Sequence, residues 1–146
     1  MIPDVNVLVA MARPDHVHHR AAREFVANTL GPSSRTRALR LVPVVVSGFL
    51  RIATHPRIFR QPTELQEALH FIDALLAKPA VEMVPTGSEW PELRDLCRRH
   101  ALVGNRVPDA WIASIVLRSG DRLITFDRGF GRLLDARRLI LLTAVH

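Results

Sequence analysis

The chain contains little cysteine and few aromatic residues, and each shortage excludes a class of site. With one cysteine, Cys97, it can form no disulfide within the chain and no cysteine-rich zinc site. Tyrosine is absent and the aromatic fraction is 5%, which argues against a surface on which nucleic-acid bases stack. No apolar run reaches the roughly 18 residues that span a bilayer, and the start does not resemble a signal peptide. We therefore expect a cytoplasmic protein with a single domain over residues 1–146.

Lysine is also scarce, because the basic charge is carried by nineteen arginines and only one lysine, Lys78. The net charge of +6 favours an anionic partner such as nucleic acid or an acidic protein. The arginines are scattered along the chain, and a GC-rich genome would produce the same preference for arginine over lysine. Charge alone therefore shifts the balance toward nucleic acid only modestly.

The apolar pattern predicts strands that alternate with helices. Short β-branched or apolar runs at 1–5, 41–46, 81–84, 122–126 and 139–142 predict strands. Apolar residues at helical spacing predict helices within 15–30, 49–54, 63–76, 88–101 and 110–117, the last of which ends at Gly120. This alternation, without hairpin signals, predicts an α/β fold of three α/β/α layers with a central parallel sheet of four to five strands.

Three aspartates stand where apolar runs begin or end. Asp4 follows the first predicted strand, Asp127 follows the strand at 122–126, and Asp109 precedes a predicted helix. Ligands of open α/β folds bind beyond the carboxyl ends of the strands, so the three side chains should converge there. Converging carboxylates repel one another unless a cation lies between them. The sequence therefore predicts a site for Mg²⁺ or Mn²⁺, with Asp4, Asp109 and Asp127 as catalytic metal ligands.

Each aspartate also has a purely structural explanation. Asp109 suits the first turn of a helix, and Asp127 suits a turn before Arg128 and Gly129. Asp4 at the end of a buried strand is the hardest of the three to explain structurally. Asn6, Asn105 and Thr125 lie close enough in sequence to orient these carboxylates or bound water.

These segments together resemble a PIN-domain endoribonuclease, in particular the VapC toxins of bacterial toxin–antitoxin pairs. The resemblance rests on the segments 4–10, 48–56, 104–110 and 125–130, in that order and at that spacing. It covers almost the whole chain and implies a single PIN-like domain. It further implies metal-dependent cleavage of RNA at the acidic cluster, a homodimer, and a cognate VapB-type antitoxin that blocks the site.

One position departs from this pattern. The family usually carries a glutamate at the start of the helix after the second strand, and the corresponding residue here is Gly48. A site with three acids has less negative charge with which to hold a cation, so we expect weak metal binding by the free protein. The missing carboxylate also favours an alternative, a catalytically weak RNA- or protein-binding module with the same fold. A phosphoacceptor receiver is poorly supported, because it requires paired acids after the first strand.

Several other residues receive weaker predictions. Arg13, Arg51, Arg106 and Arg128 lie near the site-forming segments and are candidates for contacts with RNA phosphates, although a solvated surface explains any one of them equally well. Trp90 and Trp111 fall in helical apolar patterns, which predicts that they belong to the core. His16, His18 and His19 lack the spacing for one helical metal site, and we expect at most one of them near the acids.

Overall fold

Five short parallel strands form the centre of the computed structural model, which describes residues 1–31 and 38–143. The strands are β1 (Ile2–Pro3), β2 (Leu39–Leu41), β3 (Val81–Met83), β4 (Leu123–Thr125) and β5 (Leu139–Leu141). β4 pairs with both β1 and β5, and β2 pairs with β3. The amide of Arg40 donates to the carbonyl of Met1 at 2.8 Å, so β2 lies beside β1. The strands thus form two sheets, β1-β4-β5 and β2-β3, which adjoin at β1 and β2, and the order in space is β3-β2-β1-β4-β5.

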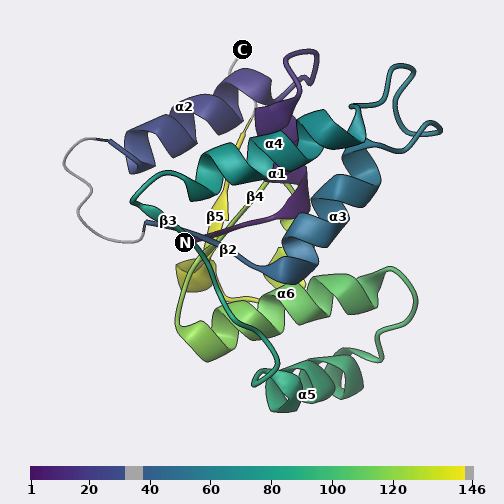
Figure 1. The fold of residues 1–146 in the computed structure, drawn as a ribbon. Coiled ribbons are helices and arrows are strands. Elements are labelled where there is room, and N and C mark those ends of the chain that lie inside the picture. The colour runs from purple at the N-terminus through teal and green to yellow at the C-terminus, as the bar shows by residue number, and fades with distance from the viewer. Residues whose placement is uncertain (32–37, 144–146) are drawn as a thin grey trace.

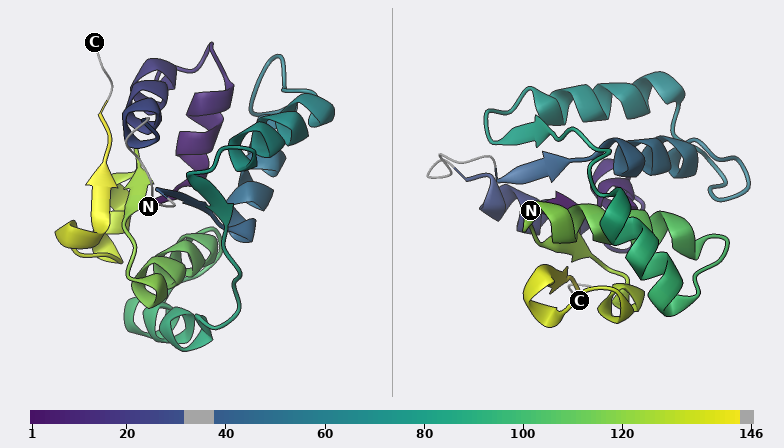
Figure 2. Two further views of the ribbon diagram at one scale, coloured as in Figure 1. Left: turned by 60° about the vertical axis from the view of Figure 1, so that its left-hand side comes forward. Right: turned by 90° about the horizontal axis from the view of Figure 1, so that it is seen from below.

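Helices cover both faces of these strands. They are α1 (Val5–Ala12), α2 (His19–Thr29), α3 (Pro43–Ala53), α4 (Leu65–Leu76), α5 (Trp90–His100) and α6 (Arg106–Ser119), with short 3₁₀ turns at Arg128–Arg132 and Ala136–Arg138. In Figure 1, α1, α2 and α4 lie above the strands, whereas α5 and α6 lie below them. Figure 2 shows the same division from two further directions. The predicted three-layer α/β/α fold is thus confirmed.

The core lies on both faces of the central strands. Ile2, Leu123 and Ile124 are fully buried, as expected of strands covered by helices on either side. Phe49 from α3 and Phe130 from the turn after β4 are the largest of the fully buried side chains. This packing fixes the carboxyl ends of β1 and β4 side by side, because Pro3 stands in register with Ile124.

Two predicted strands are shorter than expected because helices begin within them. The strand expected at 1–5 ends at Pro3, and the apolar run that follows is the buried helix α1. The strand expected at 41–46 also gives way to a helix, since Pro43 opens α3. Proline cannot donate to a strand ladder, but it suits the first turn of a helix, where the amide has no partner. Gly48 consequently lies inside α3 rather than at its start.

The helix that ends at Gly120 follows the prediction closely at its carboxyl end. Gly120 caps α6 in the left-handed conformation with φ of 74°, a geometry that glycine adopts without steric cost. The helix begins earlier than expected, at Arg106, and so it includes Asp109 in its first turn. None of the described helices is long and apolar enough to cross a membrane.

Candidate active site

Asp4 lies at the carboxyl end of β1 and is held by three neighbouring groups. Its amide donates to the carbonyl of Ile124 at 2.8 Å, which continues the pairing with β4. One carboxylate oxygen accepts from the amide of Val5 at 2.7 Å, so Asp4 caps α1. The other accepts from the Thr125 hydroxyl at 2.6 Å and from Asn6 Nδ2 at 2.7 Å. Asp4 is therefore a rigidly oriented carboxylate with only 5% of its surface exposed.

Thr125 and Asn6 extend this network to the segment that carries Asp127. Thr125 is fully buried, and its hydroxyl oxygen accepts from the Asp127 amide at 2.9 Å. Asn6 Oδ1 accepts from the Phe126 amide at 3.2 Å. Asp127 in turn caps the following 3₁₀ turn by accepting from the Gly129 amide at 2.7 Å. The two residues therefore connect Asp4 to the backbone of the Asp127 segment.

Asp109 reaches the same edge of the sheet from α6. It lies in the first turn of that helix and is partly exposed. Asn105 precedes α6 as its N-cap residue, but its side chain makes no capping hydrogen bond, and within the described part of the chain no partner links it to the aspartates. The structure thus connects Asn6 and Thr125 to the acids through hydrogen bonds, and it leaves Asn105 exposed on the adjacent loop.

The three carboxylates affect one another electrostatically. Burial raises the pKa of Asp4 to about 6; the hydrogen bonds from Thr125 and Val5 act against this rise, while the charges of Asp109 and Asp127 add to it. Burial and the charge of Asp127 also raise the pKa of Asp109, which Arg106 partly offsets. A set of acids that disfavour one another's ionised form is typical of a functional site rather than of a structural ion pair.

The donor atoms of this cluster fit a hard divalent cation. All three side chains offer carboxylate oxygens, the ligands that Mg²⁺ and Mn²⁺ take in proteins. Within 1–31 and 38–143, however, no group of three or more Asp, Glu, His or Cys side chains already lies close enough together to hold a metal ion. The carboxylates are therefore close enough to affect one another's pKa values, but they would have to move closer together to coordinate one ion.

Gly48 packs directly beneath this site. A Cβ atom added to it would lie 2.7 Å from Cγ2 of Val5, the residue that follows Asp4. Side chains essentially never tolerate such a distance, so α1 and α3 approach each other more closely than any larger residue at position 48 would allow. The missing carboxylate is therefore accompanied by tight helix packing rather than by an open space.

The four arginines predicted to contact RNA fall into two groups. Arg51, Arg106 and Arg128 are exposed, on α3, α6 and the turn after Asp127. The prediction for Arg13 needs correction, because that side chain is only 7% exposed. Its guanidinium donates to the Thr63 hydroxyl, the Gln61 carbonyl and the Asp15 carboxylate, at 3.0, 3.0 and 2.8 Å. It therefore fastens the loop before α4 and is not available to a phosphate.

Two aromatic contacts join distant segments, one beside the site and one between α6 and the start of α5. The His18 ring stacks on Phe126 with centroids 4.3 Å apart, so one histidine does lie beside the Asp127 segment. Both tryptophans were predicted to belong to the core, and this prediction is wrong. Trp90 is 60% exposed and Trp111 is 39% exposed. Trp111 donates instead to the Glu89 carboxylate at 2.6 Å, since one edge of its ring is polar. Such long-range pairings leave no local signal in the sequence.

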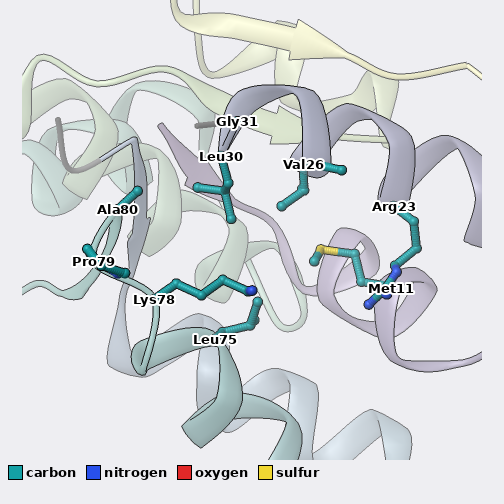
Figure 3. A pocket seen from close by; sticks show the side chains of 10 residues that line it. Met11, Arg23, Val26, Leu30, Gly31, Leu75, Lys78, Pro79 and Ala80 are labelled. Carbon is teal, nitrogen blue, oxygen red and sulfur yellow. The ribbon is translucent and has the colours of Figure 1, made fainter. Parts of the chain in front are cut away.

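A separate pocket of about 620 Å³ lies away from the acids, between α2 and the end of α4. Figure 3 shows Val26, Leu30 and Leu75 lining it, with the charged ends of Arg23 and Lys78 at its rim. None of its lining residues among those the structure describes is an acid. Its apolar walls and basic rim are those of a binding surface, not of a hydrolytic centre.

Comparison with known proteins gives consistent matches. Residues 1–134 match the model of the PIN domain. Ribonuclease VapC43 of Mycobacterium tuberculosis is 37% identical over 138 residues, which cover 92% of this chain and 90% of that protein. Ribonuclease VapC31 of the same species is 33% identical over 137 residues, 93% of this chain and 94% of the relative. The fold is also similar to that in the crystal structure of VapBC2 from Rickettsia felis bound to a promoter DNA fragment, with a TM-score of 0.68. This match covers 97% of this chain and 98% of the other at 15% sequence identity, and so it supports the fold alone.

Proposed function

Because the chain belongs to the PIN-domain family and is a VapC ribonuclease, the toxin of a VapBC toxin–antitoxin system, we propose that Asp4, Asp109 and Asp127 form its Mg²⁺- or Mn²⁺-dependent active site. The observation that carries the proposal is the hydrogen-bond network that holds Asp4 beside the Asp127 segment at the ends of β1 and β4; burial, with a smaller contribution from the neighbouring carboxylates, also raises the pKa values of Asp4 and Asp109. No arginine or lysine forms an ion pair with any of them among the described residues. A divalent cation would supply the missing positive charge.

The chain's own groups have separable roles in hydrolysis. A bound Mg²⁺ or Mn²⁺ would supply an activated water and stabilise charge on the attacked phosphate. Asp4 is held by Thr125 and Asn6 and would act as the fixed ligand. Asp109 is partly exposed and would complete the site from α6. Arg51, Arg106 and Arg128 would contact phosphates on either side of the reacting one, and Asn105 would contribute an amide at the rim.

The test is RNA cleavage by the wild type and by Asp109→Asn, with Mg²⁺ and with EDTA. We expect the substitution to lower the rate by about 100-fold or more, because it removes a metal-binding charge. Asp95→Asn, which neutralises an exposed acid on α5, is the matched control and should cleave normally. Equal metal-dependent cleavage by both variants would exclude Asp109 from the site. Binding of RNA without turnover in any divalent metal would favour the alternative of a catalytically weak binding module.

The three-acid composition predicts weak binding of Mn²⁺ to the free protein, because ligand charge sets the affinity of oxygen sites. Calorimetric titration can sharpen this prediction with a fourth acid. Gly48→Glu requires space, which Val5→Ala would provide by removing the Cγ2 atom 2.7 Å from the new Cβ. The double variant should bind Mn²⁺ more tightly than Val5→Ala alone, by about ten-fold. Tight binding to the wild type would contradict the assignment of a weak site.

We propose a VapB-type antitoxin as the protein partner, with an apolar and acidic segment in the pocket between α2 and α4. The apolar walls would bury its side chains, while Arg23 and Lys78 would pair with its carboxylates. Co-expression with the antitoxin and pull-down of Arg23→Glu should show weakened capture, whereas Arg20→Glu on the exposed side of α2 should not. We also propose a homodimer, which light scattering of the purified toxin tests directly.

A further inference from the structure

The arginines of this chain divide into those with internal partners and those without. Arg40 and Arg118 pair with carboxylates of distant segments, and Arg13 pairs with the nearby Asp15. Arg98, Arg99 and Arg106 are exposed to solvent and form no ion pair within the described residues. Exposed cations without an internal partner are available to an external anion.

Three of the arginines without an ion pair lie where α5 meets α6, whereas others, such as Arg51 and Arg128, lie elsewhere on the surface. Arg98, Arg99 and His100 form the last turn of α5, and Arg106 opens α6 after only five intervening residues. The connection turns sharply at Ala101, whose φ of 47° is left-handed. Figure 1 shows the two helices side by side and joined by this short loop. We refer to Arg98, Arg99, His100 and Arg106 as the α5–α6 corner.

The corner adjoins the acidic site. Asp109 lies one turn after Arg106 on the same helix, and the charge of Arg106 reaches it, since it lowers the pKa that burial and Asp127 raise. The corner therefore lies beside the helical turn that carries Asp109.

Helix stability alone does not account for the corner. One cation in the last turn of a helix interacts favourably with its macrodipole, by a few tenths of a kcal/mol up to about 1 kcal/mol. A second arginine in the same turn repels the first, and no carboxylate of the described residues pairs with Arg98 or Arg99. The excess charge requires another explanation.

We propose that the α5–α6 corner is an RNA-binding rim that holds backbone phosphates of the substrate next to the scissile bond. This inference rests on the proposed function, since it assumes that the acids of α6 and β4 are the cleavage site. Arg106 would contact a phosphate close to the metal ligands, and Arg98 and Arg99 would contact the following part of the strand. Such contacts fix position and affinity but read no bases.

The experiment is titration of a fluorescently labelled single-stranded RNA in EDTA, which prevents cleavage, at a series of salt concentrations. Arg98→Gln/Arg99→Gln removes two charges and keeps good helix formers. Arg122→Gln/Arg137→Gln removes two exposed arginines that precede β4 and β5, at the opposite edge of the sheet. We expect the corner variant to bind about ten-fold more weakly at low salt, and its logarithmic salt slope to fall by about 1.4, or 0.7 for each lost phosphate contact. The control should match the wild type.

The outcomes separate the two proposals. If the wild type binds RNA and the corner variant binds equally well, the rim is overturned while the ribonuclease site stands. If both double variants weaken binding equally, net charge rather than the corner is responsible, and the rim is again overturned. Loss of antitoxin capture with unchanged RNA affinity would assign the corner to a protein partner. If the wild type does not bind RNA at all, the proposed substrate itself fails.

Discussion

The acidic residues at the two ends of the central strands have opposite electrostatic surroundings. At the amino end, Asp121 precedes β4 and lies against both the N-terminal ammonium group and Arg40, which also pairs with Glu82 at 2.9 Å. Burial alone would raise the pKa of Asp121, but the interactions with Ser119, the N-terminus and Arg40 outweigh it and lower this pKa. At the carboxyl end, burial raises the pKa of Asp4 to about 6, and the charges of Asp109 and Asp127 add to this rise. One end is neutralised by basic groups of the chain, whereas the acids of the other end have no basic ion-pair partner among the described residues.

This contrast separates charges that stabilise the fold from charges that serve the reaction. Both ends belong to the same two strands, so strand packing cannot explain the difference. A buried carboxylate with basic partners can stabilise the fold. A buried carboxylate among other acids destabilises the fold unless a cation binds to it. The comparison therefore supports the proposed site at the carboxyl edge, and substitutions at the two ends should differ in sign.

The largest effect is expected at the neutralised end. Asp121→Asn should lower the free energy of unfolding by about 2 kcal/mol, because it leaves the largely buried Arg40 and the N-terminus with one partner fewer. Urea unfolding measures the change. Glu24→Gln breaks an exposed pair with Arg20 at 3.9 Å and serves as control, with an expected loss below about 0.5 kcal/mol. Equal small losses would remove the distinction between the two ends.

The pH dependence of stability should show both ends at once. The folded-state pKa of Asp4, about 6, lies above its ordinary value of 3.8. The folded protein therefore binds more protons in this range, and stability should fall by about 1–2 kcal/mol as pH rises from about 4 to 6. Asp121 has a lowered pKa, so its stabilising contribution is present above its ordinary value and is lost as pH falls further into acid.

Stability measured in EDTA should consequently be highest near pH 4, between the range in which Asp4 loses its proton and the range in which Asp121 gains one. Asp4→Asn removes the titrating charge and keeps one of the two side-chain oxygens, and it should flatten the slope between pH 4 and 6. An unchanged slope in this variant would mean that another group titrates there.

The location of the acids was predictable from the sequence, but their surroundings were not. The parallel order of β1 and β4 follows from alternating apolar runs, and it places Asp4 beside the Asp127 segment. The helix α1 was missed because eight mostly apolar residues in a buried helix look like a buried strand. Arg13 was misassigned because its partners Thr63 and Gln61 lie in a distant loop. Gly48 shows its role only through the 2.7 Å approach to Val5.

The smallest effect should have the opposite sign to the largest. Asp109→Asn removes one of the mutually repelling charges, and it breaks no hydrogen bond with another described residue. It should therefore raise the free energy of unfolding, by about 0.5 kcal/mol, since the side chain is only partly buried and solvent screens the repulsion. Urea unfolding in EDTA measures the gain, with Asp95→Asn as the exposed control. A gain in stability combined with loss of cleavage would show that the fold tolerates this acid for the sake of the reaction, because a residue kept for structure would not destabilise it. A loss of stability instead would place Asp109 with Asp121, among the charges that hold the molecule together.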